Sequence, residues 1–265
     1  MLLVIDVGNT NTVLGLLDGA AVVHQWRIST IQRTTDEFGL LCLQLLGHHG
    51  VPPRDVRGVV VGSVVPSLLY AIEKACRRYL ASRVKVVDSR MNLGIPVLVD
   101  NPGEVGADRI INAVAAAERL KPPFLIVDFG TATTFDCVNA AGAYVGGVIA
   151  PGLQISADAL FTRTSRLPRI EVQRPSTAIG TNTVHAMQSG LFWGYVGLVD
   201  GLARRCKQEL GGGGPVPCIA TGGLSNLIGR ACEEIDDVDE HLTLQGLRLC
   251  FERLESPEVL ASPST

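Results

Sequence analysis

The sequence predicts an α/β protein built from two homologous halves that face one cleft. Two apolar stretches, residues 2–5 and 124–127, have the composition of buried β-strands, and each is followed by an aspartate, Asp6 or Asp128. In both places a glycine stands two residues after the aspartate, followed by a short run rich in threonine or asparagine. Because the pattern occurs in both halves of the chain, an internal duplication explains it best.

Periodicity and chain-breaking residues define the elements of the first half. Strands are expected near residues 2–7, 12–17, 20–28, 57–64 and 84–87. A helix is expected near 36–48, started by Thr35 or Asp36, and another from Pro66, a residue suited to the first helical position, to about residue 80. A third helix is expected from about 104 to 120, where alanines at 113 and 115–117 favour helix.

The second half repeats the order of three strands followed by helices. Strands are expected near 124–129, 133–138, 143–150 and 216–221, and helices near 152–162 and 180–209. A third glycine turn, at 222–225, leads into a further helix. The break around 121–123 gives a first domain of residues 1–121 and a second of 122–255, with a frayed tail at 256–265.

The two aspartate and glycine motifs suit phosphate binding. A carboxylate at the end of a strand can hold a hydrated cation by its oxygens. Gly8 and Gly130 allow close approach of backbone N–H groups to phosphate oxygens, and the adjacent hydroxyl and amide side chains add further hydrogen bonds. The alternative is that each motif is only a β-hairpin turn, because glycine with asparagine or threonine is also common there.

A second constellation lies between the two motifs, in residues 101–109. Asn101 and Pro102 are good starters for the following helix, so Asp108 falls in its first turn, where free N–H groups and the helix dipole favour an ionised carboxylate. Such a carboxylate can accept the proton of a substrate hydroxyl during phosphoryl transfer. Arg109 can bind a substrate carboxylate or the transferred phosphate. The alternative is a helix-start charge beside a solvated surface arginine.

Composition excludes several classes of function. The net charge of −3 and the isoelectric point near 6.0 give no general attraction to nucleic acid or to an anionic membrane. None of the lysines stands in a glycine-rich loop, so the P-loop signature is absent. The seven cysteines are scattered without a C-x-x-C pair, as expected for reduced thiols of a cytoplasmic protein. Neither a signal peptide nor a membrane-spanning helix is expected.

Four blocks in series resemble type III pantothenate kinase: residues 6–10, residues 101–102 with 106–109, residues 128–133 and residues 179–183. The resemblance runs from residue 2 to about 250. It implies two ribonuclease H-like domains of the acetate and sugar kinase/heat-shock chaperone/actin superfamily. It also implies ATP-dependent phosphorylation of the primary hydroxyl of pantothenate, the first step of coenzyme A biosynthesis.

The resemblance further implies roles for individual residues. Asp108 would be the general base, Asp128 would bind a monovalent cation, K⁺ or NH₄⁺, and ATP would be used with Mg²⁺. Pantothenate would contact Gly106, Ala107, Asp108, Arg109 and Thr183. ATP would contact Asp6, Val7, Gly8, Asn9, Thr10, Asn11, Thr12, Val13 and Thr131. A homodimer is expected, with pantothenate at the subunit interface. One departure is Val99, where the family commonly carries a tyrosine.

Two other functions fit the same fold. One is a non-catalytic regulator similar to the Bvg accessory factor, and the other is a kinase of the same superfamily acting on a sugar or acetate. The combination of Asp6, Asp108, Arg109 and Asp128 favours an enzyme, because a pure binding module does not require this set of charges. His185, next to the last block, is expected to be structural more than functional.

Overall fold

The computed structural model describes residues 1–80, 83–211 and 214–256, which form two compact units. Unit 1 comprises Met1–Pro96, Asp100–Ala115 and the chain from His241 onward, and unit 2 comprises Val97–Val99 and Ala116–Glu240. The boundary between the units therefore lies between residues 115 and 116, a few residues before the expected one. The C-terminal helix belongs to unit 1 and not to unit 2. The predicted tail at 256–265 lies outside the described residues, except for Ser256.

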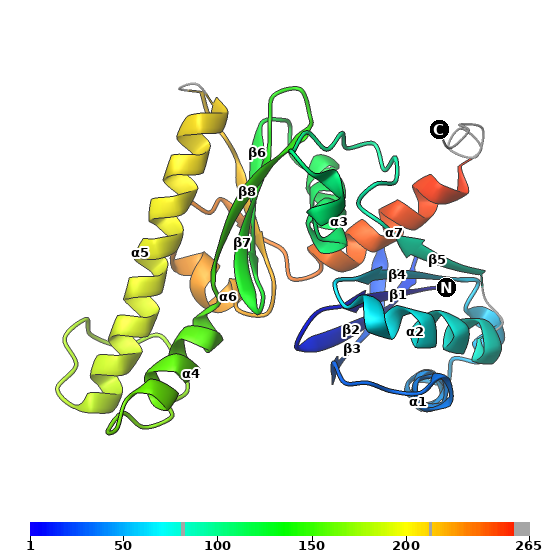
Figure 1. Ribbon diagram of the computed structural model, residues 1–265, viewed down its shortest axis with the longest axis horizontal. Coiled ribbons are helices and arrows are strands. Elements are labelled where there is room, and N and C mark those ends of the chain that lie inside the picture. Colours follow the sequence, from blue (N-terminus) through cyan, green and yellow to red (C-terminus); the bar gives the residue numbers. More distant parts are fainter. Residues whose placement is uncertain (81–82, 212–213, 257–265) are drawn as a thin grey trace. The chain divides into compact units, whose positions relative to one another are not determined.

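Unit 1 is built on a mixed sheet with the strand order β3-β2-β1-β4-β5 (Figure 1). The antiparallel pairs are β1–β2 and β2–β3, and the parallel pairs are β1–β4 and β4–β5. All five strands were expected from the sequence. Their bounds are Leu2–Val7 (β1), Asn11–Asp18 (β2), Ala21–Ser29 (β3), Gly58–Ser63 (β4) and Arg83–Val87 (β5).

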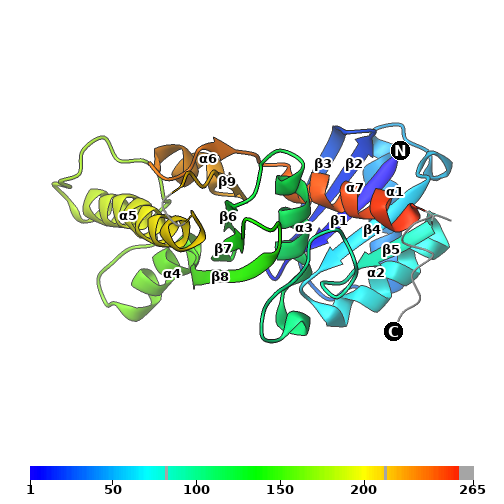
Figure 2. The same ribbon diagram turned by 90° about the horizontal axis from the view of Figure 1, so that it is seen from above.

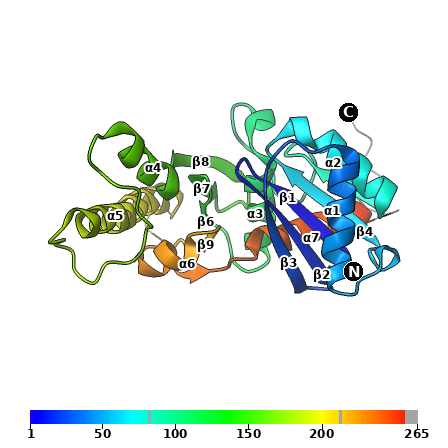
Figure 3. The same ribbon diagram turned by 90° about the horizontal axis from the view of Figure 1, so that it is seen from below.

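Helices cover both faces of this sheet, which is why β1 is apolar at successive positions. Leu3, Ile5 and Val7 of β1 belong to a core shared with α1 (Thr35–His48) and α2 (Pro66–Tyr79). Val4 faces the other way, toward α7 (Leu242–Glu255). Val4 and Leu244 of α7 both pack against Gly15. Helix α7 lies in front of the sheet in Figure 2, and α1 lies in front of it in Figure 3.

Helix α1 begins with a capping box that the sequence analysis did not identify. Its N-cap is Thr34, one residue before the expected start, and the Thr34 hydroxyl accepts the N–H of Glu37 while the Glu37 carboxylate accepts the N–H of Thr34. This reciprocal pairing satisfies two N–H groups that have no partner within the helix.

The helix expected from about residue 104 begins later. Asn101 donates its side-chain N–H to Glu104 at 2.7 Å across a separate 3₁₀ turn, Pro102–Glu104, and Val105 is extended. Helix α3 then runs over Ala107–Ala117. It packs on β4 and α7, because a Cβ at Gly62 would lie 2.6 Å from Ile111 and a Cβ at Gly246 would collide with the same residue.

Unit 2 repeats the topology of unit 1, with the strand order β10-β9-β6-β7-β8. Strand β6 pairs antiparallel with β7 and parallel with β9, as β1 does with β2 and β4. The duplication predicted from the two motifs is therefore confirmed at the level of strand order. The bounds are Phe124–Phe129 (β6), Ala132–Val138 (β7), Tyr144–Pro151 (β8), Cys218–Thr221 (β9) and Asp237–Val238 (β10).

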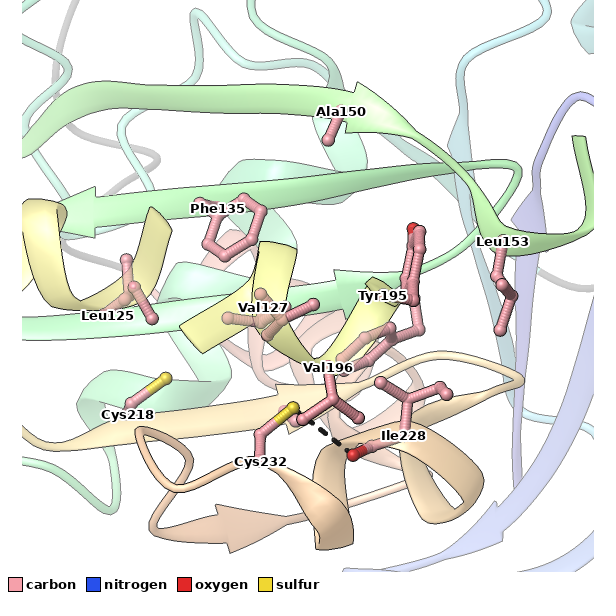
Figure 4. Packing of buried hydrophobic residues seen from close by; sticks show 14 of the residues in the cluster. Leu125, Val127, Phe135, Ala150, Leu153, Tyr195, Val196, Cys218, Ile228 and Cys232 are labelled. Atoms are coloured by element: carbon pink, nitrogen blue, oxygen red, sulfur yellow. Dashed lines mark hydrogen bonds between the residues drawn. The ribbon is translucent and has the colours of Figure 1, made fainter. Parts of the chain in front are cut away.

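One face of this second sheet packs against α5 (Thr183–Gly211), with α4 (Leu153–Arg163) and the short α6 (Ser225–Ile228) beside it. Figure 4 shows Tyr195 and Val196 of α5 among Val127 and Phe135 of the sheet. In the described part of the chain, no helix combines the length and hydropathy needed to cross a membrane.

The packing of α1 on α2 gives a test of the fold. A Cβ at Gly39 would collide with the ring of Tyr79, whereas a Cβ at Gly47 of the same helix would meet nothing within 4 Å. We expect Gly39→Ala to lower the free energy of unfolding by about 1–3 kcal/mol through overpacking. The control Gly47→Ala should raise it by up to about 1 kcal/mol. Urea denaturation measures both; equal effects would contradict this packing.

Candidate active site

The first motif is the tight turn between β1 and β2. The N–H of Gly8 donates to the carbonyl of Asn11 at 3.0 Å. Thr30, just after β3, fixes the turn from the side, because its N–H donates to the Thr10 carbonyl and its hydroxyl to the Gly8 carbonyl. The hairpin alternative thus describes the backbone correctly, but it does not exclude phosphate binding, because Asn9 and Thr10 at the tip are exposed.

The side chains of this motif divide into two groups. Asp6, Gly8 and Val13 are half-buried, and Asn11 is exposed like the tip residues. In contrast, Val7 lies in the core, and Thr12 is buried with its hydroxyl 2.8 Å from that of Thr30. Val7 and Thr12 can therefore offer a nucleotide only their backbone groups in this conformation.

Asp6 lies on the sheet face that α3 covers. Alternation along β1 places it on the same face as Val4, opposite Val7, and it pairs in register with Gly62 of β4, against which α3 packs. The N–H of Val64, just after β4, donates to the carbonyl of Val7 at 3.0 Å. A Cβ at Gly106 would lie 3.5 Å from Val64. The start of α3 thus lies at the end of the sheet where β1 and β4 finish.

Asp108 occupies this helix start. Its Oδ1 accepts the N–H of Arg109 at 2.9 Å, and a Cβ on Gly106 would collide with the same oxygen. Burial raises the pKa of the Asp108 carboxyl, and this effect outweighs the N–H and the guanidinium of Arg109, which lower it. The helix start, which is visible in the sequence, favours the charge. The structure adds desolvation, which makes the carboxylate a better proton acceptor.

The second motif is built in the same way in unit 2. Thr131 is exposed at the turn between β6 and β7. Thr133 is not part of this exposed surface, because it is buried and its hydroxyl lies 2.5 Å from that of Tyr195. Gly152, which opens α4, approaches the turn so closely that a Cβ there would collide with the Thr131 carbonyl.

The third glycine turn lies against Asp128. Gly222 follows β9, whose Thr221 pairs in register with Asp128, and its φ of +93° favours glycine. A Cβ at Gly222 would lie 2.5 Å from Oδ1 of Asp128 and 2.7 Å from the backbone of Phe129. The carboxylate therefore lies in a cradle of backbone that a side chain would fill. The turn is visible in the sequence, but its contact with Asp128 is not.

The cradle would offer a cation one carboxylate together with backbone groups. Among the described residues, no group of three or more His, Cys, Asp or Glu side chains is arranged to hold a metal ion. A cation at Asp128 would thus be completed by backbone, hydroxyl, water or phosphate oxygens, which hard cations accept.

Thr183 and Val99, both in unit 2, complete the predicted site residues. Thr183 is exposed at the first position of α5, where the Asn182 side chain accepts the N–H of His185. His185 also contacts the Asn182 amide through Nδ1 at 3.1 Å, in agreement with a structural role. A Cγ atom of Val99 would lie 3.8 Å from a Cβ at Gly146.

Comparison with known proteins identifies a family. The sequence model of the type III pantothenate kinases matches residues 2–205. The type III pantothenate kinase of Myxococcus xanthus (strain DK1622) is 52% identical over 254 residues, which cover 96% of this chain and 98% of that protein. The enzyme of the same name from Koribacter versatilis (strain Ellin345) is 50% identical over 268 residues, covering 97% of both chains.

Solved structures share the fold at low identity. A candidate 2-dehydro-3-deoxygalactonokinase from Sinorhizobium meliloti has a TM-score of 0.58 at 12% identity, covering 96% of this chain and 99% of that one. The activator of 2-hydroxyisocaproyl-CoA dehydratase from Clostridium difficile, solved with bound ADPNP, has a TM-score of 0.51 at 17% identity, covering 98% of both chains. The expected α/β fold, shared with this candidate sugar kinase, is thereby confirmed.

The cradle at Asp128 gives a test of the second loop. We expect Gly222→Ala to fold but to lose most ATP turnover, because the added methyl group displaces Asp128 and strains the left-handed backbone. Gly142→Ala is the matched control, since Gly142 also has a positive φ but its Cβ would meet nothing closer than 3.8 Å. A coupled ADP-release assay distinguishes the two variants. Equal loss in both would show that strain alone is responsible.

Proposed function

Because the chain belongs to the type III pantothenate kinase family, we propose that it phosphorylates the primary hydroxyl of pantothenate from ATP with Asp108 as the general base. The product is 4′-phosphopantothenate, and the reaction opens coenzyme A biosynthesis. The observation that best supports the role of Asp108 is its place at the start of α3, half-buried and with a raised pKa. All seven cysteines are free and buried, which supports a cytoplasmic enzyme.

In this mechanism Asp108 accepts the proton of the substrate hydroxyl. The hydroxyl oxygen forms a bond to the γ-phosphorus as the bond from that phosphorus to the β,γ-bridging oxygen breaks, and ADP leaves. The N–H of Arg109 fixes one carboxylate oxygen of Asp108, which orients the base. A Cβ at Gly106 would collide with the Asp108 carboxylate, so glycine keeps that carboxylate unobstructed, and Arg109 offers a guanidinium for a polar end of the substrate.

Two turns of like construction, one in each unit, offer groups that suit ATP phosphates. The run from Asp6 to Val13 offers backbone N–H groups and the exposed Asn9, Thr10 and Asn11 side chains. Thr131 offers an exposed hydroxyl in the second turn. Mg²⁺ bound with ATP would neutralise phosphate charge, and Asp6 is the carboxylate best placed in unit 1 to hold its waters.

Asp128 is proposed to bind a monovalent cation, K⁺ or NH₄⁺. The backbone cradle formed around its carboxylate by Gly222 and Gly130 supports this assignment. Such an ion would add positive charge beside the phosphates in a chain that lacks the P-loop signature.

We also propose a homodimer formed through α5. Gly190, Gly194, Gly197 and Gly201 share one face of this helix, and a Cβ at any of them would meet nothing within 4 Å. Ile179 and Trp193 in the same region are 83% and 37% exposed. An open glycine face flanked by exposed apolar side chains suits close approach of another helix.

The other functions considered for this fold are less well supported. A regulator of the Bvg accessory type or a sugar or acetate kinase would not explain about 50% identity to type III pantothenate kinases over nearly the full chain. Assays with pantothenate, acetate and hexoses as acceptors distinguish the three. Turnover with pantothenate alone supports the proposal, and turnover only with another acceptor, or with none, contradicts it.

Replacement of Asp108 should separate activity from stability. Asp108→Asn is expected to lower kcat by about 100- to 10,000-fold through loss of the base. A carboxyl whose pKa is raised on folding binds its proton more tightly in the native state, so it lowers stability once pH exceeds its unfolded value. The variant should therefore have a higher Tm than wild type at neutral pH. Full activity in the variant would refute the role.

The pH profile is a second test of the base. Activity requires ionised Asp108, so kcat/KM should decrease as pH falls through its pKa. The midpoint of this acid limb should lie above the ordinary aspartate value of 3.8, because burial raises the pKa. An acid limb at or below that value would contradict the proposed environment.

The cation assignment is tested by ion replacement. Activity with pantothenate should fall when K⁺ is replaced by Na⁺ at constant ionic strength, and Asp128→Asn should lose this dependence together with most activity. Activity that is indifferent to the ion would contradict a specific site at Asp128.

The proposed dimer is tested by filling the glycine face. Gly194→Leu should shift the protein to a monomer in analytical ultracentrifugation, because the larger side chain prevents close helix approach. Gly47→Leu places the same side chain at an equally open helical glycine of unit 1 and should leave the assembly unchanged. A dimeric Gly194→Leu variant would exclude this interface.

A further inference from the structure

A buried carboxylate lies behind the second phosphate loop and takes no part in the proposed mechanism. Asp136, on β7, is fully buried. Its Oδ1 accepts the hydroxyl of Tyr144 at 3.1 Å, and its Oδ2 accepts the hydroxyl of Thr134 at 3.1 Å. Burial of a carboxylate is costly unless its oxygens are hydrogen-bonded, so the two hydroxyls and the carboxylate form one interdependent group.

This group shares a sheet face with Asp128. Phe135 and Cys137 point into the core beneath α5, so alternation along β7 directs Thr134 and Asp136 to the opposite face. In the register between β6 and β7, Thr134 is the direct partner of Asp128. Directly paired residues of neighbouring strands have Cβ atoms about 5 Å apart on the same face.

The direction of the hydrogen bond determines what Thr134 offers to Asp128. A hydroxyl has one proton and two lone pairs. Because Thr134 donates its proton to Asp136, its oxygen can act only as an acceptor toward any other neighbour. An acceptor oxygen beside a carboxylate is the combination that a hard cation requires.

Tyr144 contacts both Asp136 and the segment that precedes residues 100–109 in the chain. Its hydroxyl holds Asp136, and its backbone carbonyl accepts the N–H of Leu98 at 2.8 Å. Val97 forms a parallel bridge with the same residue. The segment 97–99 immediately precedes residues 100–109, so the anchor of Asp136 is also the anchor of this segment.

We propose that Thr134 is an oxygen ligand of the monovalent cation at Asp128, and that Asp136 and Tyr144 are positioning residues which hold its hydroxyl in the accepting orientation. This inference rests on the proposed function of Asp128 as a cation site. It extends that site from a single carboxylate to a pair of side chains on adjacent strands, supported by a buried network. Neither Asp136 nor Tyr144 would touch the ion or the substrates.

The test measures cation binding apart from catalysis. The intact protein, with a non-hydrolysable ATP analogue and Mg²⁺, is titrated with KCl in choline chloride at constant ionic strength, and the rise in Tm gives a half-saturating K⁺ concentration. Thr134→Val removes the hydroxyl at constant shape, and Tyr144→Phe removes only the anchor hydroxyl. We expect the half-saturating concentration to rise about 10- to 100-fold in both, as for loss of a metal ligand or its support.

Tyr195→Phe is the matched control. It removes a tyrosine hydroxyl that bonds to Thr133 and to the Pro151 carbonyl on the other face of the same sheet. Its Tm without K⁺ should fall as in Tyr144→Phe, while its half-saturating K⁺ concentration should stay within about twofold of wild type. A purely structural role for the network would move the two tyrosine variants alike.

The outcomes separate this inference from the proposed function. A wild-type K⁺ midpoint in Thr134→Val would overturn the inference while leaving the Asp128 site and pantothenate kinase activity intact. A wild-type protein that phosphorylates pantothenate but shows no K⁺-specific stabilisation would overturn both the inference and the cation at Asp128. An increase in KM for ATP at saturating K⁺, without a change in the K⁺ midpoint, would also reject the proposed ligand role.

Discussion

Both units depend on one strand arrangement: a central strand buried on both faces, paired antiparallel on one side and parallel on the other. In unit 1 this strand is β1, and in unit 2 it is β6. Each strand is apolar except at its next-to-last position, which is Asp6 in β1 and Asp128 in β6. Asp6 pairs with Val13 and Gly62, and Asp128 pairs with Thr134 and Thr221. Only at this end can a carboxylate reach polar surroundings without disrupting the core.

The same arrangement explains why glycine recurs beside each carboxylate. The parallel neighbour ends at the same edge, so its following turn approaches the central strand closely. Gly222 packs against Asp128 in this way. Gly62 packs against Ile111 of α3, and Asp108 lies at the start of the same helix. Close packing at this edge thus depends on backbone contacts that side chains would prevent.

Much of the fold could be predicted because its signals are local. The apolar strands, the two aspartate and glycine motifs and Pro66 at the start of α2 are visible within a few residues. The start of α3 was misplaced because the Asn101 and Glu104 side chains close a separate turn. Helix α7 was missed altogether, although Leu244 and Leu247 fill the face of the first sheet that α1 and α2 leave open.

The site was predicted less completely, because burial is a property of the folded unit. Thr12 and Thr133 are chemically equivalent to Thr10 and Thr131, yet the first two are buried against Thr30 and Tyr195. The close approach of Gly152 to Thr131 and the buried group around Asp136 join residues distant in sequence or on different strands, which pattern reading does not detect.

The proposed function requires that the carboxylate at the end of each central strand contributes to nucleotide binding. Calorimetric titration with an ATP analogue and Mg²⁺ tests it most directly, using Asp6→Asn and Asp128→Asn, each of which keeps the shape of the side chain. Both variants should remain folded and should bind the nucleotide at least about tenfold more weakly than wild type. Wild-type affinity in either variant would contradict a contribution of that carboxylate to ATP binding.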